Sequence, residues 1–89
     1  MQEPIITRSL HGGAQKLYRF ANGYGASVVR NEFSYGGWDG KWELAVIKWV
    51  GEDFDLVYDT PVTDDVIGRC DDDDIAALLD EIERLPVAV

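Results

Sequence analysis

Alternating apolar and polar residues in the first two thirds of the chain predict β-strands. The run 16–20 alternates, Asn22-Gly23 follows it, and residues 24–30 form a second β-rich run. An Asn-Gly pair between two such runs is typical of a hairpin with a type I′ turn, because both residues tolerate a positive φ. Gly25 lies just beyond this turn, where a glycine indicates a bulge or a close approach of two backbones.

A second pair of strands is predicted after a glycine-rich loop at residues 34–40. The run 41–50 is apolar on both of its faces, one with Trp42, Leu44 and Val46 and the other with Ala45, Ile47 and Trp49. A short turn then leads into a strand at 54–59. Pro61 ends that strand, because proline cannot donate to a strand ladder.

The last third of the chain is predicted to be helical. Apolar residues recur at spacings of three and four over residues 71–85, which indicates an amphipathic helix. The dipole of this helix favours the aspartates of its first turn and Arg84 of its last, and Pro86 ends it. Residues 63–68 are typical of a short single turn closed by glycine, and residues 1–14 are expected to form an irregular N-terminal arm.

These elements predict a single α+β domain that spans residues 1–89. The simplest arrangement is a four-stranded antiparallel meander with one C-terminal amphipathic helix packed on one face. Because the run 41–50 is apolar on both faces, the second face of the sheet also needs cover. Either the sheet curls into a partial barrel, or a partner covers this face, which could be a second copy in a homodimer or higher oligomer.

Charge is distributed very unevenly along the chain. Residues 51–89 hold thirteen acidic residues against two arginines, whereas residues 1–50 hold six basic residues against four acidic ones. The net charge is −9. Such an acidic segment repels phosphate backbones and favours basic proteins, so direct binding of DNA or RNA is disfavoured.

Four segments of the chain form a specific pattern. They read Y-R-F at 18–20, N-G-Y-G-A-S-V-V-R at 22–30, W-E-L-A-V at 42–46 and Y-D-T-P-V-T-D-D-V-I-G at 58–68, and an acidic helix follows. This pattern is similar to that of a family of short uncharacterised proteins encoded by bacteriophages and prophages, particularly those of actinobacteria. The resemblance implies no activity, cofactor or catalytic residue. It implies a phage setting, where small proteins that bind and disable host machinery are common.

The acidic residues are the first candidate site. An EF-hand needs a glycine at its sixth position, which the run beginning at Asp71 lacks, and no metal site is expected. The aspartates at 71–74 can cap the helix, but four are more than a cap needs. Such carboxylates either dock on a basic protein, where a row of them can imitate the phosphates of a duplex, or only keep the chain soluble. The candidate partner-binding residues are Asp59, Asp64, Asp65, Asp71, Asp72, Asp73, Asp74, Asp80 and Glu81.

The aromatic residues around the glycine-rich loop are the second candidate site. Together with nearby basic side chains such as Lys41, they could stack a base and neutralise its phosphate. The alternative is that they are contacts in the core or in a dimer. The candidate ligand-binding residues are Tyr24, Arg30, Tyr35, Trp38 and Trp42.

His11 and Cys70 are weak candidates for chemistry. No nucleophile motif accompanies the single histidine, and metal sites usually need more ligands. The acidic residues beside Cys70 raise the pKa of a thiol, so we expect a small buried residue there. Neither an enzyme nor a cofactor is expected. With one cysteine, no apolar N-terminal stretch and no apolar run of membrane length, the host cytoplasm is the expected location, without membrane contact.

The sequence therefore predicts a small acidic, non-enzymatic accessory protein of a phage or prophage. Its acidic face is expected to bind and inhibit a host protein with a basic surface, such as a nucleic-acid-binding site. One alternative is an oligomeric sponge that holds a nucleotide signal between its aromatic loops. Another is a component of the virion or of its assembly.

Overall fold

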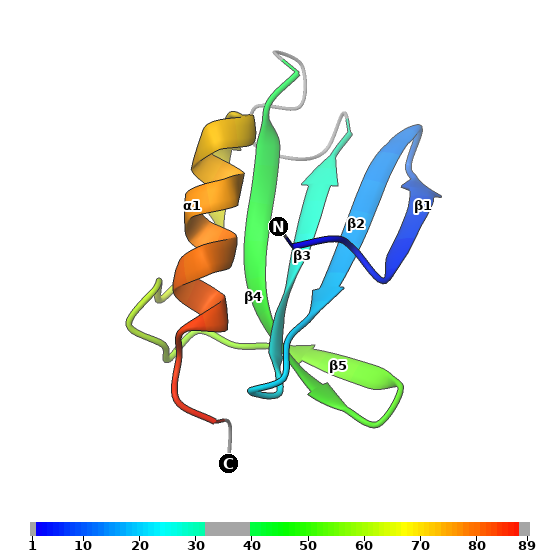
Figure 1. Ribbon diagram of the computed structural model, residues 1–89. Helices are drawn as coiled ribbons and strands as arrows, with labels where there is room; N and C mark the ends of the chain where they lie inside the picture. The colour runs from blue at the N-terminus through cyan, green and yellow to red at the C-terminus, as the bar shows by residue number, and fades with distance from the viewer. Residues whose placement is uncertain (1, 32–39, 88–89) are drawn as a thin grey trace.

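The computed structural model describes residues 2–31 and 40–87 (Figure 1). Within them, six strands form one antiparallel sheet and a single helix follows. The elements are β1 (Ile6–Leu10), β2 (Gly13–Arg19), β3 (Tyr24–Arg30), β4 (Trp42–Val50), β5 (Asp53–Leu56), β6 (Ile67–Cys70) and α1 (Asp72–Glu83). The sheet order is β1-β2-β3-β4-β5, and β6 pairs with β4. The α+β class with a C-terminal helix is therefore confirmed.

The predicted meander is present as β2 to β5, and the structure adds two strands to it. Strand β4 is long enough to hold two partners on one edge: its end pairs with β5, and its start pairs with β6. The short turn predicted at residues 63–68 does not extend to Gly68: Ile67 and Gly68 begin β6, which pairs with β4 with a register shift. Strand β5 ends at Leu56, earlier than predicted.

The N-terminal arm is not irregular, which corrects the expectation for residues 1–14. Strand β1 pairs with β2 along its whole length, and the two-residue turn His11-Gly12 joins them. Both turn residues have positive φ, 50° for His11 and 79° for Gly12, as a type I′ turn requires. All of β1 except Leu10 is exposed at the sheet edge, so its sequence carries little apolar alternation.

The turn at Asn22-Gly23 joins β2 and β3 as predicted, but it is not of type I′. Gly23 has a φ of 90°, whereas Asn22 does not have a positive φ. The Gly23 N–H donates to the Phe20 carbonyl at 3.1 Å, and the Phe20 N–H donates to the Tyr24 carbonyl at 2.8 Å. These bonds describe a three-residue loop with glycine in the left-handed conformation.

Two apolar clusters cover the two faces of the sheet. The residues of the helix-side cluster include Trp42, Leu44 and Val46 of β4 and Ile75, Leu79 and Ile82 of α1. On the other face, Leu17, Ile47 and Trp49 pack with Phe54. The predicted division of β4 into two apolar faces is confirmed.

The second face is covered by the curled sheet itself. The Trp49 indole passes over Gly25, and its Nε1 donates to the Tyr18 carbonyl at 2.8 Å. A Cβ at Gly25 would lie 1.9 Å from this oxygen, so the predicted close approach is confirmed. Arg19 lies over the Trp49 ring and donates to the Gly51 carbonyl in the β4–β5 turn. This face was expected to be covered either by curling of the sheet into a partial barrel or by a partner, and the structure shows a half-barrel.

Candidate functional site

The acidic residues of the last third gather on one side of the molecule. Figure 1 shows the β5–β6 connection beside α1, and Val57 and Val62 of this connection pack against the helix-side cluster. Residues 57–87 contain ten carboxylates, all of them exposed, against two arginines. We call these ten carboxylates the acidic side. They are the nine predicted partner-binding residues, Asp59, Asp64, Asp65, Asp71, Asp72, Asp73, Asp74, Asp80 and Glu81, together with Glu83.

Three of the four aspartates at the start of α1 also hold the fold together. Asp71 Oδ1 accepts a hydrogen bond from the Asp74 N–H at 2.8 Å, and Asp74 Oδ2 accepts one from the Asp71 N–H at 3.1 Å. This reciprocal pair is a capping box. Asp72 Oδ1 accepts from Trp42 Nε1 at 2.9 Å, which fastens the helix to β4. The helix-cap alternative for this run is thus confirmed.

The capping box also changes the ionisation of its first residue. The hydrogen bond from the Asp74 backbone holds the pKa of Asp71 below its usual value, and the charge of Lys41 acts in the same direction. Asp71 is therefore a carboxylate at neutral pH, as both the cap and an acidic docking surface require.

The outward face of α1 carries carboxylates with small residues between them. Asp73 and Asp80 are seven residues apart, which places them about 10.5 Å apart along the helix axis on nearly the same line. Ala76 and Ala77 lie between them and are exposed. Gln2 reaches this helix from the N-terminal segment, and its Nε2 donates to Asp80 Oδ1 at 2.6 Å. The outward face of α1 between Asp73 and Asp80 is therefore accessible to a partner along most of its length.

Of the three residues of the predicted aromatic site that the structure describes, Arg30 and Trp42 are in contact and Tyr24 lies apart from them. The Arg30 Cζ lies 4.2 Å from the centre of the Trp42 ring, at one end of the sheet. Tyr24 pairs with Lys48 at the other end of β3, six residues from Arg30, which is about 20 Å along a strand. Tyr35 and Trp38 lie outside the described residues.

Trp42 is a core residue and does not offer an open stacking surface. It is 5% exposed, and its ring carries two cations, with Lys16 Nζ at 4.7 Å from the ring centre and Arg30 at 4.2 Å. A base that stacked on this ring would have to displace one of these cations. The core alternative is therefore confirmed for Trp42, and half-buried Tyr24 also packs against the core.

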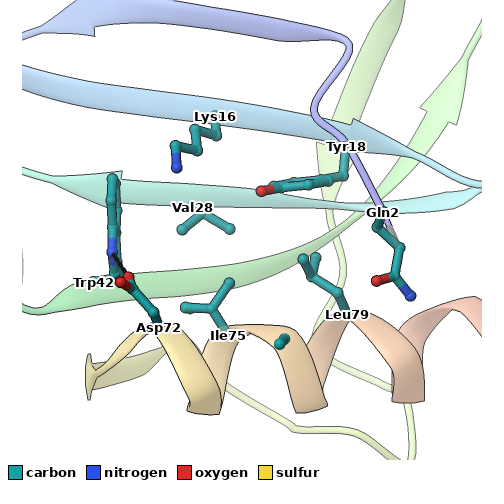
Figure 2. Close-up of a pocket in the computed structure, with 9 residues that line it drawn as sticks. Gln2, Lys16, Tyr18, Val28, Trp42, Asp72, Ile75 and Leu79 are labelled. Carbon is teal, nitrogen blue, oxygen red and sulfur yellow. Dashed lines mark hydrogen bonds between the residues drawn. The ribbon is translucent and has the colours of Figure 1, made fainter.

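A cavity of about 250 Å³ lies beside Trp42, between the sheet and α1. In Figure 2 the Lys16 ammonium and the Tyr18 hydroxyl point into this space. Burial raises the pKa of Tyr18, so the hydroxyl keeps its proton. Neither residue was predicted as a site residue from the sequence, although their spacing of two on β2 is the signal that places them on one face.

Cys70 lies at the end of β6, where it packs with the helix-side cluster. Its Sγ is 3.6 Å from the Ile67 carbonyl. Burial raises the pKa of the thiol, and the charges of Asp74 and Asp71 raise it further. Cys70 was expected to be buried and to have a raised thiol pKa, and both expectations are confirmed.

Residues 2–31 and 40–87 contain no group of three or more His, Cys, Asp or Glu side chains that could hold a metal ion. No helix in this part of the chain is long and apolar enough to cross a membrane. No family model, no curated protein and no solved structure matches the chain. The resemblance to phage proteins stays a prediction.

Proposed function

We propose that this chain is a small non-enzymatic accessory protein of a phage or prophage, which binds and inhibits a basic host protein through its acidic side. The observation that carries this proposal is the separation of charge. Ten exposed carboxylates lie on α1 and the segments around it, whereas residues 1–50, which contain the first four strands, hold six basic residues against four acidic ones.

This separation favours one class of partner. A concentrated negative surface attracts a basic protein over a distance comparable with the Debye length, which is about 8 Å at physiological salt. Attraction of this kind raises the rate of association and orients the partner before contact. A row of carboxylates on a helix can also compete with phosphates for the arginines and lysines of a nucleic-acid-binding site.

The fold presents the acidic side on a rigid support. The capping box fixes the start of α1, and the Asp72–Trp42 hydrogen bond ties this start to β4. Three apolar residues of α1 are buried in the core. A preorganised surface of this kind loses little conformational entropy on binding, which favours affinity.

The nucleotide-binding alternative has less support. Its central residue, Trp42, is buried under two cations, and Tyr24 lies at the far end of β3.

The test is a comparison of two charge-matched variants in capture from an actinobacterial host lysate. The acidic-side variant carries Asp73→Asn, Asp80→Asn and Glu81→Gln, which leave the capping box and the Trp42 bond intact. The control variant carries Asp53→Asn, Asp55→Asn and Glu52→Gln in the β4–β5 hairpin, and all three of these residues are exposed. Both variants lose the same three charges, so a difference between them reports position and not net charge.

The proposal predicts that the wild type and the hairpin variant capture the same basic protein at about 50 mM salt and lose it at about 500 mM. The acidic-side variant should capture much less of it. Equal capture by all three proteins would contradict the proposal, and so would capture that does not change with salt.

A further inference from the structure

We propose that the cavity beside Trp42 binds a small organic carboxylate with an apolar body. This site goes beyond the proposed function, because it lies between the sheet and α1 and would take a small anion and not a basic protein. The cavity combines two hydrogen-bond donors, one of them a cation, with an apolar wall.

The donors are the Tyr18 hydroxyl and the Lys16 ammonium, on one face of β2. Tyr18 is 5% exposed, and no hydrogen bond joins its hydroxyl to another group in the described part of the chain. In this part of the chain every fully buried side-chain N or O atom has a hydrogen-bond partner, so the Tyr18 hydroxyl is accessible from the cavity. Lys16 contacts the Trp42 ring, and within the same residues no carboxylate lies within 4.0 Å of its Nζ. The two groups therefore offer donors to an acceptor in the cavity.

The charge around the cavity selects a monoanion. Lys16 and Arg30 both lie over the Trp42 ring, and Asp72 is the carboxylate that lines the space. Asp72 is held on the Trp42 indole N–H at 2.9 Å. Lys16 is the cation that lines the cavity, and Asp80 and Glu83 accept hydrogen bonds from Gln2 at its other end. A monoanion can pair with Lys16, whereas a dianion such as a phosphate monoester would meet stronger repulsion from Asp72 and from these two carboxylates. A carboxylate has two oxygens, one for Lys16 and one for Tyr18.

The apolar wall selects the body of the ligand. Val28 of β3 and Ile75 and Leu79 of α1 line the cavity between the donors and the helix (Figure 2). A volume of about 250 Å³ corresponds to about eight water molecules at about 30 Å³ each. This space suits a branched aliphatic or single-ring acid. Gln2 lies at the other end of the cavity from Trp42, so the N-terminal segment limits the length of a ligand.

The test uses phenylacetate as the probe and phenylacetamide as its neutral match. Both are titrated into the wild-type protein over the millimolar range, while NMR follows the methyl groups of Val28, Ile75 and Leu79. The proposal predicts saturable shifts of these methyl signals with phenylacetate, and at least about tenfold weaker binding of phenylacetamide, which lacks the charge. Equal affinity of the two probes would overturn it, and so would unchanged methyl signals throughout the phenylacetate titration.

Single substitutions then identify the donors. Tyr18→Phe removes only the hydroxyl and Lys16→Met only the ammonium, and each should weaken phenylacetate binding about tenfold or more. Lys48→Met removes an ammonium from β4, away from the cavity, and should leave the affinity unchanged. Equal binding by all three variants would overturn the assignment. If either cavity variant fails to fold, the comparison of the two probes on the wild type still decides the proposal.

Discussion

The side-chain amide of Asn22, in the turn between β2 and β3, donates a hydrogen bond to the Ile82 carbonyl in the last turn of α1, at 2.9 Å. The same nitrogen lies 3.0 Å from the Leu85 carbonyl, while Asn22 Oδ1 accepts from the Tyr24 N–H at 3.0 Å. The last carbonyls of a helix have no partner within the helix, so Asn22 supplies one. This contact locks the helix that carries the acidic side onto the sheet.

Replacement of Asn22 should therefore destabilise the protein. Asn22 is 8% exposed, and Asn22→Ala leaves buried carbonyls without their donor, which costs about 1–3 kcal/mol. Asn22→Asp keeps the acceptor for Tyr24 but places a negative charge at the negative end of the helix dipole, so it should be worse at neutral pH and recover on acidification. Urea denaturation measures the free energy of unfolding. A loss below about 0.5 kcal/mol for both variants, as for a neutral surface change, would contradict this role.

Gly25→Ala should be among the most destabilising single changes in the sheet. The added Cβ would meet the Tyr18 carbonyl oxygen at 1.9 Å and Trp49 Nε1 at 2.6 Å, so the indole that covers the second face must move. We expect a loss of about 2 kcal/mol or more in the free energy of unfolding, together with a change in Trp fluorescence. Gly51→Ala is the control, because its Cβ meets nothing within 4 Å and only the positive φ opposes it. The order of the two losses, measured in urea, should not reverse.

The contrast between β4 and β1 shows which strands could be predicted from the sequence. Apolar alternation is strong where a strand packs on both sides, and the two faces of β4 were predicted correctly. It is weak in β1, whose side chains are mostly exposed. The type I′ turn at His11-Gly12 lacks the usual Asn-Gly pair. Asn22-Gly23 does form the predicted turn between β2 and β3, and the Asn22 side chain also donates to the Ile82 carbonyl, a contact sixty residues away along the chain that the sequence does not indicate.

Acidification should weaken the cap of α1. The folded-state pKa of Asp71 is lowered, so its contribution to stability is fully present above the pKa of the unfolded chain and is lost as the pH falls through the folded-state value. Asp71→Asn keeps a good N-cap and should remove this part of the pH dependence, whereas Asp71→Ala should destabilise the helix at all pH values.

Thermal unfolding measured from neutral to acidic pH checks this prediction. Asp73→Asn is the control, because Asp73 is exposed beside the cap but its side chain is not part of the capping box. The same pH dependence in the wild type and in Asp71→Asn would show that the cap does not depend on ionisation of Asp71.

Cys70 should react slowly with thiol reagents in the folded protein. Burial and two neighbouring aspartates raise the pKa of its thiol, so little of the reactive thiolate forms at neutral pH. Modification by a disulfide reagent should be much faster in urea than in buffer. Because the unfolded chain loses this proton first as the pH rises, stability should also fall at alkaline pH. Rapid modification of the native protein at neutral pH would contradict the buried position.

The candidate sites were less predictable than the fold, because they depend on contacts between distant segments. The sequence indicates an acidic helix, and the carboxylates of that helix are indeed exposed. It does not indicate that Asp72 accepts a hydrogen bond from Trp42, or that Lys16 and Arg30 both lie over the Trp42 ring, because these contacts depend on the register of the strands. For the same reason, the sequence does not indicate that Tyr24 and Trp42, on neighbouring strands, lie at opposite ends of the sheet.

The central claim is that the acidic side guides a basic host protein to this molecule. The most direct test is the association rate constant of the purified captured partner, measured with the wild type and the two charge-matched variants at about 50 mM and about 500 mM salt. This claim predicts a fall of about tenfold or more with salt for the wild type and the hairpin variant, and a slower rate that falls less with salt for the acidic-side variant. One common rate for all three proteins at both salt concentrations would contradict it.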